Sequence, residues 1–121
     1  MDTSMSLHVQ QVNTVAEAEA LLQTVGATPA GIALMREKVV FRVILVENVS
    51  TKAANLLKQT FLSKGADAAV SCHTADLSAP TTSVLLFATL ATYRRAVQTL
   101  RLQPWGLKEL ADGLAHRLQL E

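Results

Sequence analysis

The chain has 121 residues, which fits one domain, and half of them are hydrophobic, so a sizeable core is expected. Eleven Lys and Arg residues against ten Asp and Glu residues leave a net charge of +1. No overall electrostatic field would draw in a nucleic acid or an anionic membrane surface. We therefore predict a single domain over residues 1–121, with no nucleic-acid and no membrane partner.

Cysteine content and the amino terminus bear on localisation. The one cysteine, Cys72, has no partner for an internal disulfide, which favours a reducing compartment. Residues 1–4 lack the basic and apolar regions of a secretory signal. The longest apolar run, residues 39–46, is interrupted by Arg42 and is far too short to span a membrane. These features predict a cytoplasmic protein.

The first predicted elements are a strand followed by two helices. Residues 6–12 have the length and the apolar content of a strand. Thr14 stands three residues before a Glu, as in a capping box, and begins a helix that Gly26 ends. Thr28, followed by Pro, opens a short second helix that runs to about residue 38.

The middle of the chain predicts a strand, a helix and a strand. Residues 39–46 are apolar and β-branched on both faces, which is typical of a strand that is covered on both sides. Ser50 begins a helix, and Lys64 and Gly65 end it. Residues 67–72 form the next strand. Together these elements predict a βαβ unit, right-handed and with parallel strands.

A loop, a strand and two helices complete the prediction. Residues 73–82 are small, polar or Pro, and form the longest irregular stretch. A strand over residues 83–88 leads to a helix that begins at Thr89, and a last helix follows the break at residues 104–106. The order β-α-α-β-α-β-β-α-α predicts an α/β fold, with helices packed on a small mixed, partly parallel four-stranded sheet. Strand order stays open.

The residues that could carry chemistry are scattered. His8, His73 and His116 lack the spacing of metal ligands and are predicted to be isolated. Cys72 is predicted to be a plain buried thiol, because its neighbour His73 would point to the opposite face of a strand. No glycine-rich phosphate loop is present. We predict no catalytic residue, no metal site and no cofactor in this segment.

Three residues are candidates for binding: Arg42, Lys58 and Gln59. Arg42 is the one charge in an apolar strand, and a structural ion pair is favoured over an anion site. Its candidate partners are Glu47, Asp67 and Asp76. Lys58 and Gln59 lie in the middle of the third predicted helix, on a solvated face or on a docking surface for another domain or subunit.

A basic strip on the fourth predicted helix comprises Arg94, Arg95 and Arg101. A nucleic-acid site usually combines such a strip with interleaved aromatic residues and a basic total charge, and both are missing. A solvated helix face is therefore the preferred interpretation.

Three stretches together resemble a known family. They are residues 31–44, residues 53–59 with 62–70, and residues 84–89 with 103–111. In this order and spacing they are similar to the N-terminal extension of the long dihydropteroate synthases of Clostridia-like bacteria. The chain departs from that pattern at Thr60 and Phe61, where an acidic residue and Met are expected, and at Trp105, where Phe is expected.

The resemblance implies a role in folate biosynthesis. Dihydropteroate synthase is a transferase that joins hydroxymethylpterin diphosphate to para-aminobenzoate, and its sites belong to a TIM barrel of about 250 residues. None of its catalytic residues can be carried onto this chain. The resemblance thus implies a non-catalytic N-terminal accessory domain of a longer protein. Its partner would be the C-terminal pterin-binding barrel of the same chain, and a homo-oligomer stays open.

Two other hypotheses remain. One is a free-standing small-molecule binding module, with its crevice at the strand ends near residues 73–82. The weakest is a small enzyme that uses Cys72 or a histidine.

Overall fold

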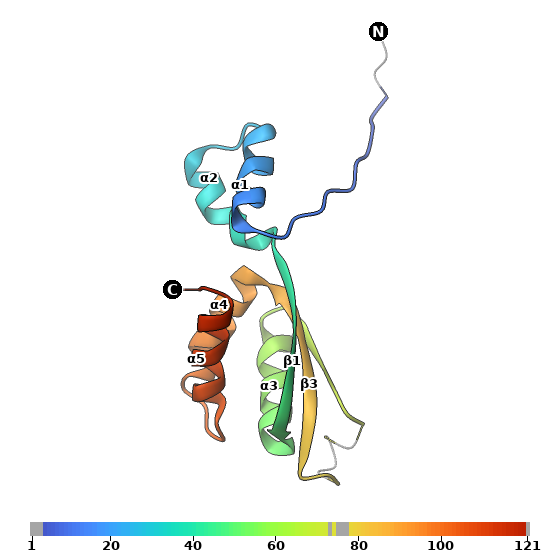
Figure 1. Cartoon of the computed structure of the whole chain (residues 1–121), viewed down its shortest axis with the longest axis vertical. Coiled ribbons are helices and arrows are strands. Elements are labelled where there is room, and N and C mark those ends of the chain that lie inside the picture. Colours follow the sequence, from blue (N-terminus) through green and yellow to red (C-terminus); the bar gives the residue numbers. More distant parts are fainter. Residues whose placement is uncertain (1–3, 73, 75–77, 121) are drawn as a thin grey trace.

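The computed structural model describes residues 4–72, 74 and 78–120, and within them it forms a mixed α/β fold (Figure 1). Five α-helices, one short 3₁₀ helix and three strands occur in this part of the chain. In chain order they are α1 (Val15–Thr24), α2 (Pro29–Met35), the 3₁₀ helix η1 (Arg36–Lys38), β1 (Phe41–Ser50), α3 (Thr51–Ser63), β2 (Asp67–Val70), β3 (Thr81–Thr89), α4 (Leu90–Leu100) and α5 (Leu107–Arg117).

The sheet has the strand order β1-β3-β2, and both pairs of neighbours are antiparallel. The predicted four-stranded, partly parallel sheet is therefore wrong. β1 and β2 do run in the same direction, because each is antiparallel to β3, but β3 lies between them. The β1-α3-β2 unit is thus a split βαβ unit, as in the β-α-β-β-α-β motif. Apolar patterns identify strands but do not say which strands are neighbours.

The first predicted strand, residues 6–12, is an extended segment without a strand partner in the described chain (Figure 1). Leu7 and Val9 within it, and Met5 just before it, are each more than 90% exposed, whereas Val12 at its end packs against the core. A β-strand forms its backbone hydrogen bonds with a neighbouring strand. The local apolar pattern describes one strand and says nothing about whether a neighbour is present.

The predicted helix starts are confirmed. The side-chain oxygens of Thr14, Thr28, Ser50 and Thr89 each accept a hydrogen bond from the backbone amide three residues further on. The donor–acceptor distances are 3.1–3.2 Å. These bonds satisfy first-turn amides that have no partner within the helix, so the caps define where the helices begin.

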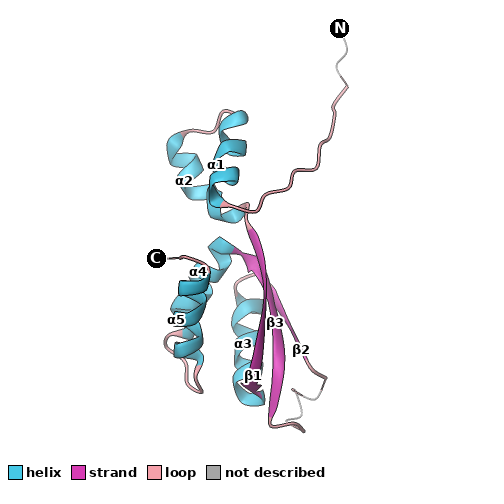
Figure 2. Ribbon diagram, viewed as in Figure 1, coloured by secondary structure: helices cyan, strands magenta, loops and turns pink. Residues whose placement is uncertain are grey.

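The core lies between one face of the sheet and the helices α3, α4 and α5, which gather on that side (Figure 2). β3 contributes Val84 and Leu86, and both are fully buried. Phe61 of α3 and Tyr93 of α4 meet edge to face, with ring centroids 5.6 Å apart. The Tyr93 hydroxyl donates to the carbonyl of Arg42 at 2.9 Å, and burial raises the pKa of this phenol.

Among the described residues, no helix lies over the opposite face of the sheet (Figure 2). Phe41, Val43 and Leu45 of β1 point to that side and are 52%, 58% and 58% exposed. The expectation that this strand is covered on both faces is therefore wrong for the described chain. Apolar side chains on both faces of a strand show that either face could be covered, and in the described chain only one of them is.

β1 contains a bulge just before α3. Val46 lies opposite Val84 but Val49 lies opposite Thr82, so β1 has one extra residue in this interval. Asn48 has a φ of 59°, in the left-handed region. The extra residue turns Val49 to the helix side, where it is buried, and brings Ser50 into position to cap α3.

Candidate interaction surface

We call the uncovered side of the sheet the open face. It consists of alternate side chains of the two paired strands β1 and β3: Phe41, Val43, Leu45, Leu85 and Phe87. The strand register places Val43 opposite Phe87, and Leu45 opposite Leu85. All five side chains are apolar, so they form a continuous patch across the two strands. Contiguous apolar patches on a protein surface mark sites of interaction more often than isolated apolar residues do.

A depression adjoins one end of the open face. It has a volume of about 370 Å³, and its lining includes Phe41 and Phe87, with Gly65 and Asp67 beside them. Asp67 is its only carboxylate among the described lining residues. A hydrogen bond from Lys58 lowers the pKa of Asp67, so this carboxylate stays ionised well into the acid range.

Arg42 donates hydrogen bonds to backbone carbonyls and does not form the expected ion pair with the described residues. Its guanidinium donates to the carbonyl of Phe41 at 3.1 Å and to the carbonyl of Asn13. Neither Glu47 nor Asp67 is its partner among the described residues, and Asp76 lies outside them. Arg42 therefore ties the residues that precede α1 to the start of β1.

Lys58 and Gln59 take part in different contacts. The Lys58 ammonium donates to the Asp67 carboxylate at 2.9 Å and to the Ala68 carbonyl at 2.7 Å, which fastens α3 to β2. Gln59 lines a shallow apolar depression of about 370 Å³ beside Trp105. The structure does not gather the three candidate residues into one site, and their binding role stays a prediction.

Trp105, which lies in the predicted break between the last two helices, is a surface residue that was not among the candidate binding residues. Its side chain is 56% exposed, and its backbone adopts a φ of 63°. Leu102 nearby in the chain is 89% exposed. A large aromatic side chain in a Pro-Trp-Gly turn was the signal available in the sequence, because such turns lie on the surface.

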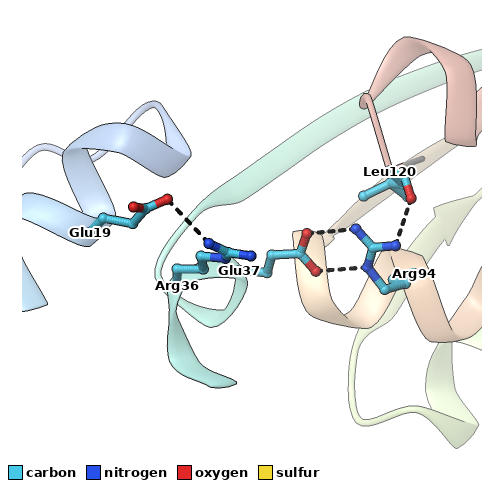
Figure 3. A network of polar contacts seen from close by, with 5 residues as sticks. All are labelled: Glu19, Arg36, Glu37, Arg94 and Leu120. Atoms are coloured by element: carbon cyan, nitrogen blue, oxygen red, sulfur yellow. Dashed lines mark hydrogen bonds and ion pairs between the residues drawn. The ribbon is translucent and has the colours of Figure 1, made fainter. Parts of the chain in front are cut away.

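Two of the three arginines of the basic strip, Arg94 and Arg101, form ion pairs within the chain. Arg94 forms two hydrogen bonds with the Glu37 carboxylate, at 2.8 and 2.7 Å, and donates to the Leu120 carbonyl at 2.6 Å (Figure 3). Arg101 pairs with Asp112 at 3.0 Å. Arg95 and Arg101 are exposed, as expected for a solvated face, whereas Arg94 is partly buried.

The residues considered for catalysis do not converge. Cys72 is exposed, so the predicted buried thiol is wrong, and His73 lies outside the described residues. In the described part of the chain, no group of three or more His, Cys, Asp or Glu residues could hold a metal ion. No helix there is long and apolar enough to cross a membrane.

Comparison with known proteins gives one curated relative. The chain is 34% identical over 110 residues to a protein of Halobacterium salinarum described as a "Probable bifunctional folylpolyglutamate synthase/dihydropteroate synthase". The similarity covers 91% of this chain but only 13% of the relative. No family model matches the chain, and no solved structure matches it. The chain is thus similar to a small part of a larger folate-pathway protein.

Proposed function

We propose that this chain is an accessory domain of a dihydropteroate synthase, with an interaction or regulatory role in folate biosynthesis. Hydroxymethylpterin diphosphate would be joined to para-aminobenzoate in a pterin-binding barrel outside these 121 residues. The domain would itself contribute no catalytic residue, and its contact with the barrel would be its function.

The observation that supports this proposal is the apolar open face, together with the similarity of this chain to a small part of a larger protein. Similarity to 13% of a larger folate-pathway protein supports a place beside other domains. Val43 and Leu45, more than half exposed, lie at the centre of an apolar surface that another domain could cover. The cores of protein interfaces are depleted in charge and rich in aromatic residues, and the open face has this composition. We propose that the barrel covers it.

Calorimetric titration of this chain with a separately purified pterin-binding barrel of a dihydropteroate synthase tests the proposal. Val43→Glu should weaken binding at least tenfold, because a carboxylate would be buried without a partner. Gln98→Glu is the matched control, since it adds the same charge at an exposed position of α4 and should leave the affinity unchanged. Equal affinity of the wild type and Val43→Glu would remove the open face from the proposal.

A second candidate function is a small-molecule binding module. It is favoured by the depression beside Phe41, Phe87 and Asp67, which combines apolar walls with a carboxylate. A thermal-shift screen with pterins, nucleotides and folates tests it, because a ligand that binds only the folded state raises the unfolding temperature. An unchanged unfolding temperature with all three classes at millimolar concentration would count against this candidate.

A further inference from the structure

The outer edge of β1 is open in the described chain and lacks the usual protection of an edge strand. β1 has ten residues, whereas the other outer strand, β2, has four. Natural edge strands are commonly blocked by Pro, Lys or an early bulge. Residues 41–46, before the bulge, contain neither Pro nor Lys. Their one charge, Arg42, donates to the carbonyls of Phe41 and Asn13, which leaves residues 43–46 of this edge without a charged side chain. This edge could therefore accept another strand.

A groove beside this edge would receive one face of an added strand. It lies between β1 and α5 and has a volume of about 340 Å³. Its apolar walls are Ile44 and Val46 on the strand, and Leu110 and Leu114 on the helix. Ile44, Val46 and Leu110 are only partly buried, although they pack against the core. Apolar side chains of an added strand would complete their burial.

A segment with the matching pattern exists in the chain itself. We call residues 4–12 the arm. Met5, Leu7 and Val9 alternate with polar residues, which is the period of a strand with one apolar face. Each of the three is more than 90% exposed. The arm is extended and projects from the body of the molecule (Figure 1).

The arm leaves the body at a fixed point. Val12 packs against the core, and Arg42 holds the carbonyl of Asn13 at the start of β1. From there the arm extends away from the sheet (Figure 1). To reach its own β1 edge, the arm would have to reverse direction at Asn13 and give up these contacts. A second copy of the chain can present its edge without that cost.

We propose that two copies of this chain exchange arms, so that the arm of each adds a fourth strand to β1 of the other. In one chain the arm and β1 run in roughly the same direction (Figure 1). A two-fold axis perpendicular to them makes the arm of one copy antiparallel to β1 of its partner, and the contact is reciprocal. Met5, Leu7 and Val9 then face the groove between β1 and α5. This dimer is independent of the proposed function, because the open face takes no part in it.

Cysteine cross-linking between two different variants tests the exchange directly. In a Cys72→Ser background, a Leu7→Cys chain is mixed with a Gly113→Cys chain and treated with a short bismaleimide. The exchange predicts a covalent dimer in the mixture and none in either variant alone. A chain that carries both Leu7→Cys and Gly113→Cys is treated in the same way. If it cross-links within one chain while the mixture of single variants gives no product, the arm folds onto its own β1, and the proposal is wrong.

The oligomeric state gives a second test. Sedimentation of the wild type should give twice the 13.0 kDa of one chain. In Gly113→Gln the longer side chain should fill the groove and raise the dimer dissociation constant at least tenfold. Sedimentation should then give the mass of one chain. Gly113→Ala is the matched control and should remain dimeric, because no atom lies within 4 Å of an added Cβ. Both changes favour the helix over Gly, so misfolding would not explain a monomer. A monomeric wild type at high micromolar concentration would overturn the proposal.

Discussion

Arg94 links three separate segments of the chain through a single side chain. Its guanidinium holds the Glu37 carboxylate of η1 by two parallel bonds and reaches the Leu120 carbonyl after α5 (Figure 3). Such a paired geometry suits the planar guanidinium and cannot be reproduced by a lysine ammonium. Glu37 and Leu120 therefore depend on the same residue of α4 for their positions.

Arg94→Lys is expected to lower the free energy of unfolding by about 1–2 kcal/mol. The estimate lies below the value for a buried charged network because the Arg94 side chain is 43% exposed. Urea denaturation measures the difference. Arg95→Lys, at the exposed neighbouring position, is the control and should leave the stability unchanged. Equal losses in both variants would mean that the contacts of Arg94 contribute nothing specific.

The same contact makes stability depend on pH. The hydrogen bond from Arg94 lowers the pKa of Glu37 below its ordinary value. The folded state thus holds this proton less tightly than the unfolded state, in which glutamate titrates near pH 4.3, an approximate reference value. The stabilisation is complete above that pH and is lost as pH falls through the folded pKa. The stability difference between wild type and Glu37→Gln should therefore be large at pH 7 and shrink towards pH 3, as followed by urea denaturation. A constant difference would contradict this.

At the scale of elements, the bulge in β1 decides how the strand passes into α3. Asn48 supplies the left-handed backbone that the extra residue needs, and its side chain is exposed. Asn tolerates this conformation better than β-branched residues do, and Gly tolerates it best.

Asn48→Val is expected to destabilise the chain by about 1–2 kcal/mol, through backbone strain alone. Asn48→Gly should be neutral or slightly stabilising, because it removes the strain without removing a buried contact. Thermal unfolding followed by circular dichroism compares the two variants with wild type. If Gly is as harmful as Val, the Asn48 side chain matters more than its backbone conformation.

Local signals in the sequence predicted the helices well and the sheet poorly. The hydroxyls of Thr14, Ser50 and Thr89 act on amides three residues away, so the sequence contains both partners of each contact. The partners of β1 and β2 lie far along the chain, and a short apolar run does not identify them. The open face was missed for the same reason. Apolar residues on both faces of a strand show what could be covered, not what is covered.

For the whole molecule, the helices differ in how firmly they are built into the core. α4 contributes five buried residues, whereas α1 contributes only Ala18 and α2 only Ile32. The segment from α1 to η1 lies at one end of the sheet (Figure 2). η1 joins it to α4 through Glu37 and Arg94. Segments with few buried apolar contacts open at a lower free energy than the core does.

We therefore expect two levels of protection in native-state hydrogen exchange followed by mass spectrometry. Amides of α1 and α2 should exchange through a partial opening, and those of β3 and α4 only through global unfolding. Arg94→Lys weakens the contact that joins these helices to α4. It should therefore lower the opening free energy of α1 and α2 by more than it lowers the global free energy of unfolding. Arg95→Lys should leave both levels unchanged. Equal protection of α1 and β3 in wild type would mean that the chain unfolds as one cooperative unit, with the α1–α2 segment as firmly held as the sheet.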